Sequence, residues 1–140
     1  MDRRTRAREL AMQSLYQLDV QGGGYLGELG TFLHENSDDE AVFEMADKWS
    51  RKTWENLSVC DGFIKEAAVK WDLSRLSQVD RSILRLSVYQ LKFCPDIPGK
   101  VVINEAIELA KKYGAEQTPR FVNGVLDAIF RKLSTGEAAG

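Results

Sequence analysis

The start of the chain concentrates positive charge within a few positions. The cations are Arg3, Arg4, Arg6 and Arg8. With Asp2, these four arginines give residues 2–8 a net charge of plus three, whereas the 140-residue chain carries minus two. Positive charge is unfavourable at a helix N-terminus, so helix stability does not account for the cluster, although a capping Asp2 would offset part of the cost. Guanidinium groups pair with phosphates and stack on bases, which predicts a nucleic-acid surface; the alternative is a solvated basic end that only favours solubility.

The other residues with reactive side chains do not form a catalytic pattern. The glycine-rich segment at residues 22–30 is not followed by the Gly-Lys-Ser/Thr signature of a phosphate-binding loop. His34 is the only histidine, and Cys60 and Cys94 lack the spacing of a zinc site or a Cys-x-x-Cys pair. We therefore expect no enzyme activity, no metal and no cofactor, and we expect both cysteines to pack as small apolar side chains.

The composition favours a single helical unit. Hydrophobic residues make up 44% of the 140 positions, which is enough for one core, and the three prolines leave long stretches of good helix formers. There is no run of 18 apolar residues and no apolar leader segment, so we expect no membrane span and a cytoplasmic protein.

Apolar residues recur every three to four positions along most of the chain, which is the pattern of amphipathic helices. The first helix should end at the glycines of QGGG, and a capping box of Ser37 and Glu40 should open the third. Ser77 should cap a largely apolar helix at the centre of the core. The expected helical segments are 7–18, about 26–33, 40–53, about 58–71, 79–93, 101–113 and 118–133.

Glycine and proline positions refine the boundaries of the last two helices. Gly114 is expected as the C′ residue after one helix, and Thr118 with Pro119 as the N-cap and first residue of the next. The Asn123-Gly124 dipeptide favours a hairpin turn, but the helical period continues through it, so we predict helix there. Because a glycine inside a helix costs about 1 kcal/mol relative to alanine, we expect another helix or a ligand to approach Gly124 closely.

Four stretches of the chain, taken together, are similar to the NusB family of bacterial transcription antitermination factors. They are TRARELAMQSLYQLD, WDLSRLSQVDRSILRLSVYQL, VVINEAIELAKKYGAE and FVNGVLDAI. The similarity spans nearly the whole chain in the family's order. It implies an all-α fold of about six to seven helices in two side-by-side subdomains. Residues 1–140 would form a single RNA-binding domain, with halves at about 1–72 and 73–135.

The resemblance also implies a function. Members of the family bind the boxA element of nascent RNA, as in ribosomal RNA leaders, as a heterodimer with ribosomal protein NusE. They join RNA polymerase and other Nus factors to suppress termination, and some members are homodimers. In the family the arginine-rich N-terminus faces RNA, which maps to Arg4, Arg6 and Arg8, with Arg3 beyond them; Thr5 stands where some relatives have arginine.

We expect the RNA surface to continue onto the start of the last helix, at Arg120 and Phe121, beside an N-terminus that favours anions. Phe121 lies one position off the inward stripe, so it either stacks on a base or packs against Tyr113 or the first helix. Gln13 is expected to be available to RNA, and Tyr16 to pack.

The resemblance places NusE on the C-terminal half. The residues expected there are Asp80, Arg81, Arg85, Lys100 and Glu105. The polar end of an otherwise apolar helix must reach the surface, where charges would select the partner. The alternative is that Asp80 only caps its helix and that Arg81 is solvated.

Two other classes of function compete with this one. The first is a protein-interaction module, or a homo-oligomeric helical domain, that makes no direct contact with RNA. The second is an RNA cytosine methyltransferase, because NusB-like domains occur fused to such enzymes. The sequence shows no cofactor-binding β-α unit, which argues against the methyltransferase.

Overall fold

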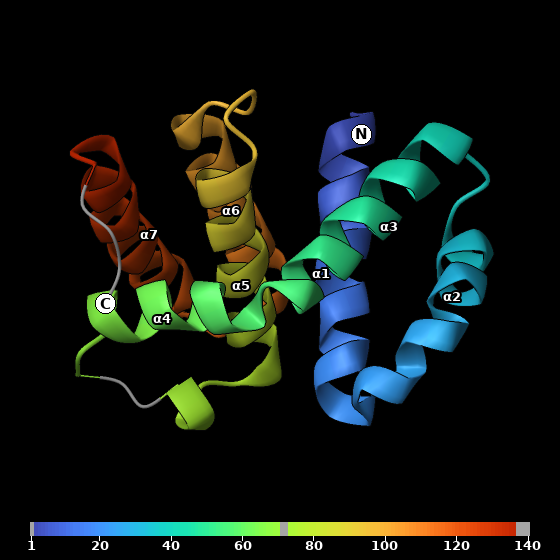
Figure 1. The fold of residues 1–140 in the computed structure, drawn as a ribbon, viewed down its shortest axis with the longest axis horizontal. Coiled ribbons are helices and arrows are strands. Elements are labelled where there is room, and N and C mark those ends of the chain that lie inside the picture. Colours follow the sequence, from blue (N-terminus) through green and yellow to red (C-terminus); the bar gives the residue numbers. More distant parts are fainter. Residues whose placement is uncertain (1, 71–72, 137–140) are drawn as a thin grey trace.

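Seven α-helices and two short 3₁₀ segments make up the computed structural model, which describes residues 2–70 and 73–136 (Figure 1). The helices are α1 (Arg3–Gln21), α2 (Leu29–Asn36), α3 (Glu40–Glu55), α4 (Leu57–Ala67), α5 (Gln78–Phe93), α6 (Gly99–Tyr113) and α7 (Thr118–Ser134). The 3₁₀ segments are η1 (Gly23–Glu28) and η2 (Leu73–Arg75). No strand occurs in the described ranges, so the all-α prediction is confirmed. Trp71, which the periodicity places on an inward face, lies outside the described residues.

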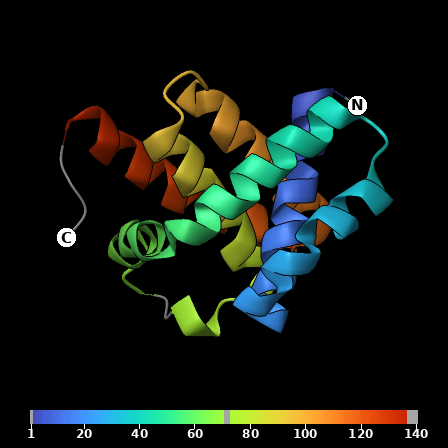
Figure 2. The same cartoon turned by 45° about the vertical axis from the view of Figure 1, so that its right-hand side comes forward.

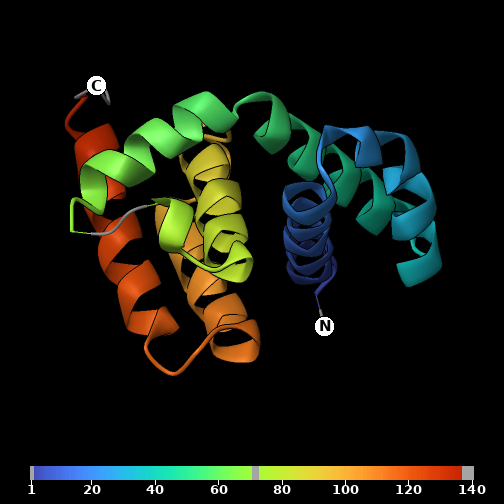
Figure 3. The same cartoon turned by 90° about the horizontal axis from the view of Figure 1, so that it is seen from below.

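Helix α5 lies at the centre of the molecule, as its apolar sequence predicts. It packs against α1, α3, α4, α6 and α7, and nearly every residue from Ser82 to Gln90 is buried. Figures 1 and 2 show α3 crossing α1 on the side away from α7. Figure 3 shows α1 standing between α3 and the group formed by α5, α6 and α7. The arginine-rich segment is the first part of α1, and it is therefore held between these two groups of helices.

The weakest packing between consecutive helices near the middle of the chain lies between α3 and α4. Helix α4 packs on α5 and α7, and it has much less contact with α3. The packing break therefore lies at Asn56, where α3 ends and α4 begins. A boundary near residue 72 remains a prediction about folding units, because packing alone does not define them.

The helix ends follow the sequence signals in part. Asp2 caps α1 by accepting from the backbone N–H of Arg4, and α1 ends before Gly22, whose φ of +88° favours glycine. Ser77 caps α5 as predicted. The capping box at Ser37 is wrong: the N-cap of α3 is Asp39, which accepts from two backbone N–H groups. A carboxylate next to the helix takes this role in place of the hydroxyl two positions earlier.

The predictions for the two late glycines are wrong in detail. Gly124 has open space where a side chain would be, so no other helix approaches it closely, and the alternative of a ligand there stays a prediction. Gly114 closes α6 in an extended conformation, and a Cβ there would lie 2.7 Å from the Thr118 side chain. Close packing rather than a left-handed turn therefore requires that glycine. Thr118 is the first residue of α7 and not its N-cap, which is Gln117.

Candidate nucleic-acid interface

The four arginines near the N-terminus have different environments. Arg3 is 70% exposed at its side chain, and its Nε donates to Asp39 at 2.7 Å. Arg4 is also exposed. Arg6 is partly exposed and donates to Glu9 and to the backbone carbonyl of Asn36. The tip of α1 therefore presents three guanidinium groups to different degrees: Arg4 is exposed, Arg3 is exposed but paired with Asp39, and Arg6 is partly exposed and paired with Glu9.

Arg8, in contrast, is buried inside the fold. Its side chain is only 4% exposed, and it donates to Gln90 and to Glu105, each at 3.2 Å. Its guanidinium also lies 5.3 Å from the ring centre of Trp49. Burial lowers the pKa of Arg8, and Glu105 acts in the opposite direction. Because Arg8 is enclosed and paired, this structure does not present it to a phosphate, contrary to the sequence-based expectation.

Next to Arg8, the carboxylate of Glu9 gathers donors from both sides of the α1–α6 junction. The side chain of Glu9 is 4% exposed. One oxygen accepts from Arg6, and the other accepts from Lys112 Nζ at 2.5 Å and from the Tyr113 hydroxyl at 2.8 Å. Burial raises the pKa of Glu9, but these hydrogen bonds outweigh it and hold the pKa below its usual value. No sequence pattern predicts this cluster, because Lys112 and Tyr113 lie more than 100 positions from Glu9.

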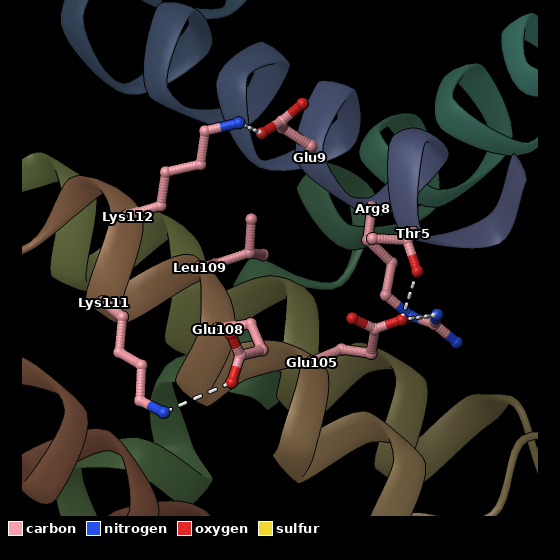
Figure 4. Close-up of a pocket in the computed structure, with 8 residues that line it drawn as sticks. All are labelled: Thr5, Arg8, Glu9, Glu105, Glu108, Leu109, Lys111 and Lys112. Atoms are coloured by element: carbon pink, nitrogen blue, oxygen red, sulfur yellow. Dashed lines mark hydrogen bonds and ion pairs between the residues drawn. The ribbon is translucent and has the colours of Figure 1, made fainter. Parts of the chain in front are cut away.

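A cavity of about 380 Å³ separates the two sets of bonds between α1 and α6 (Figure 4). On one side Thr5 and Arg8 bind Glu105, and on the other Glu9 binds Lys112. Acidic and basic side chains line the cavity together, so its charges are largely balanced. The two helices meet here mainly through polar bonds.

Further along α1, a second cavity carries aromatic and amide groups. It has a volume of about 370 Å³, and its lining includes Gln13, Tyr16, Phe32 and Tyr113. Tyr16 is 37% exposed, whereas Gln13 is half-buried and donates to the Tyr113 hydroxyl at 3.0 Å. Tyr16 therefore reaches solvent and Gln13 is engaged within the protein, which is the opposite of the environments expected for them, and their contacts with RNA stay a prediction.

The start of α7 offers a third polar and aromatic region. Arg120 is exposed, and Phe121 is half-buried against the core, so the base-stacking alternative for Phe121 is still open. Both residues line two cavities of about 330 Å³ each. Asp80 lines one of these cavities and accepts from the Thr118 hydroxyl at 3.3 Å. Asp80 therefore lies with the expected RNA residues of α7.

The five residues expected to bind a protein partner do not form one patch. Because α5 and α6 run antiparallel, Lys100 lies at the end of the helix pair opposite to Asp80, and the exposed Lys100 is separated from it by about 20 Å along the helix axis. Glu105 is bound to Arg8. The expectation of one adjoining surface is therefore wrong.

The remaining two residues of that set form an internal ion network. Arg81 donates to Asp19 at 2.8 Å, and Arg85 donates to Asp61 at 2.8 and 3.0 Å. Arg85 also reaches Asp19 at 3.4 Å. Burial lowers the pKa of Arg85, but the bonds to Asp61 and Asp19 outweigh it and raise the pKa above its usual value. These side chains join α5 to α1 and α4.

Comparison with known proteins identifies the family. The sequence model of the NusB family matches residues 5–131. The chain belongs to the NusB family. Among curated relatives, a transcription antitermination protein NusB from Anaeromyxobacter dehalogenans is 45% identical over 128 residues, which cover 91% of this chain and 89% of the relative. The resemblance first inferred from four sequence stretches is confirmed.

Solved NusB structures share the fold. NusB from T. maritima superimposes with a TM-score of 0.80 at 40% identity, with 94% of this chain and 92% of that chain covered. A complex of the antitermination factors NusB and NusE with dsRNA contains a chain with a TM-score of 0.80 at 30% identity; 94% of this chain and 98% of that chain are covered. The family has thus been seen bound to RNA and NusE.

The described part of the chain holds neither a cluster of metal-binding side chains nor a membrane-spanning helix. Among residues 2–70 and 73–136, no group of three or more histidine, cysteine or acidic side chains could hold a metal ion. Over the same part of the chain, no helix combines the length and apolar character needed to cross a bilayer.

Proposed function

We propose that this chain is a bacterial transcription antitermination factor that binds boxA-type RNA together with ribosomal protein NusE. In that role it would act in the cytoplasm and join RNA polymerase and other Nus factors through the assembled complex. The observation that carries the proposal is the basic tip of α1, where Arg3 and Arg4 are exposed on an otherwise acidic chain of a family seen bound to RNA.

The RNA path that we propose follows surfaces that share lining residues. It begins at Arg3 and Arg4 and then passes the Glu9 cluster. Tyr113 belongs to that cluster and also lines the cavity that contains Tyr16, so the two regions adjoin. Val79 lines that cavity, and the next residue, Asp80, lines the cavity beside Arg120 and Phe121. Guanidinium groups at one end would bind phosphates, and aromatic rings along the path would stack on unpaired bases.

For NusE we propose the turn between α5 and α6. Lys100 is exposed there, and the apolar side chains of Phe93 and Val101 are about two-fifths exposed at the same turn. Apolar side chains flanked by a charge are typical of a protein interface. Asp80 is the alternative contact, and the charge reversals Lys100→Glu and Asp80→Lys separate the two positions when NusE affinity is measured for each.

The competing reading is a protein-interaction module, or a homo-oligomer, that does not touch RNA. A fluorescence titration of a boxA-containing RNA oligonucleotide, with and without NusE, separates the readings. The proposal predicts saturable binding that NusE strengthens. Binding of NusE with no RNA affinity in either titration would establish the interaction module instead.

A further inference from the structure

Glu9 is an unusual residue in the surface proposed for RNA. Its carboxylate is almost fully enclosed, yet two of its three donors are cations whose own side chains reach solvent: Arg6 is 32% exposed and Lys112 is 55% exposed. The third donor, the Tyr113 hydroxyl, accepts in turn from Gln13 at 3.0 Å. One buried anion thus fixes groups from α1 and α6 in a single cluster.

The geometry leaves Lys112 able to bind a second anion. An ammonium group has three donors, and Glu9 uses one of them at 2.5 Å. The Lys112 ammonium also lies 5.4 Å from the ring centre of Tyr113, which restricts where the side chain can go. A phosphate could therefore approach Lys112 from solvent without breaking its bond to Glu9.

The neighbouring lysine is not held in this way. Lys111 is 59% exposed and pairs with Glu108 of its own helix at 3.3 Å, pointing away from Glu9 (Figure 4). The two lysines have the same charge and similar exposure, but Lys111 pairs with Glu108 and Lys112 pairs with Glu9. Lys111 is therefore a matched control for Lys112.

We propose that Glu9 is a positioning residue for RNA binding. It holds Lys112 of α6 beside Arg6 of α1, so that RNA passing between the two helix groups meets a preformed cation. The inference rests on the proposed function and deepens it. The benefit of fixing a flexible lysine before binding must exceed the repulsion between Glu9 and the RNA, which the two cations screen.

The test is a double-mutant cycle on the full chain with NusE and a boxA-containing RNA oligonucleotide. Because fixing one flexible side chain changes affinity by about twofold to tenfold, we expect Glu9→Gln and Lys112→Ala each to weaken RNA binding within that range. The double variant should be no weaker than Lys112→Ala, because Glu9 acts through Lys112. Lys111→Ala should stay within about twofold of wild type.

Each other outcome overturns the inference in a recognisable way. Tighter RNA binding by Glu9→Gln would mean that its charge only repels RNA. The same loss for Glu9→Gln in the Lys112→Ala background would mean that Glu9 does not act through Lys112, which overturns the inference. If Glu9→Gln does not fold by circular dichroism, Glu9→Asp replaces it, because it keeps the charge and shortens the reach.

The failure of this inference can be told from the failure of the proposed function. If wild-type protein binds RNA and Arg3→Ala/Arg4→Ala weakens binding while Glu9→Gln does not, only the role of Glu9 is lost. If wild-type protein does not bind RNA at all, both are lost.

Discussion

Arg8 of α1 and Glu105 of α6 form a partly buried ion pair, with Nη1 of the enclosed Arg8 3.2 Å from a carboxylate oxygen of Glu105. The sequence placed these residues on two different binding surfaces, one for RNA and one for NusE. In the structure they bind each other across the α1–α6 junction. Charge on the N-terminal helix therefore serves two purposes: the exposed arginines are available to a ligand, and the enclosed one holds the fold together.

We expect Arg8→Ala to destabilise the protein by about 2–4 kcal/mol, because it removes the cation paired with the partly buried Glu105 carboxylate and the donor to the buried Gln90 amide oxygen. Urea unfolding followed by circular dichroism measures the loss. Arg3→Ala is the control, since its solvent-exposed pair with Asp39 should contribute much less to stability. Equal stability of the two variants would contradict the structural role of Arg8.

Acid should weaken the fold through Glu9. Its folded-state pKa is below the usual glutamate value, so its ionised form stabilises the native state above the unfolded pKa, and this stability is lost as pH falls through the folded pKa. Between about pH 5 and pH 3, wild-type protein should therefore lose more unfolding free energy than Glu9→Gln. Parallel stability curves for the two proteins over this range would exclude the effect.

Arg85→Ala should destabilise the fold and leave the affinity for NusE unchanged in the folded fraction. In the wild-type structure Asp61 accepts two hydrogen bonds from Arg85, and the substitution leaves this carboxylate without them. We expect the free energy of unfolding to fall by about 2–4 kcal/mol. Thermal unfolding and NusE titration are measured on the same samples, with the exposed Lys65→Ala as control. A stable variant with lost NusE affinity would instead place Arg85 at the interface.

Cys60 should resist thiol reagents in the native state. Burial raises the pKa of its thiol to about 12, so almost no thiolate exists near pH 8, and the side chain is enclosed. With a coloured disulfide reagent, we expect Cys94, which is half-buried, to react first and Cys60 to react only after unfolding in urea. Rapid reaction of both cysteines in native protein would show that the core opens.

The helices were predictable from sequence because apolar spacing along one chain depends only on local geometry. The centre at α5 followed from its apolar sequence, and Ser77 followed from a capping signal that acts within one turn. Boundaries were less certain where two polar residues compete. Both Ser37 and Asp39 can cap a helix, and in the structure Asp39, the residue directly before the helix, accepts from its first backbone N–H groups.

The site was predictable in composition but not in arrangement. Residues such as Glu9 and Lys112 are 103 positions apart, and no local pattern connects them. Glu9 directly follows Arg8, the last arginine of the cluster, and a carboxylate at that position of a helix that must meet the core is a signal for internal pairing. Lys100 and Asp80 lie at opposite ends of the α5–α6 pair because the two helices run antiparallel. That arrangement is set by the tertiary fold and not by the local sequence.

The salt dependence of RNA affinity tests the central claim most directly. On single-stranded RNA each neutralised phosphate adds about 0.7 to the slope of log affinity against log salt, so Arg3→Ala/Arg4→Ala should reduce the slope by about 1.4. Circular dichroism should show both proteins folded. The account predicts saturable binding of boxA-containing RNA by wild-type protein and this smaller slope in the double variant. An unchanged slope with unchanged affinity would contradict it, because the exposed arginines at the tip of α1 would then not contact the RNA.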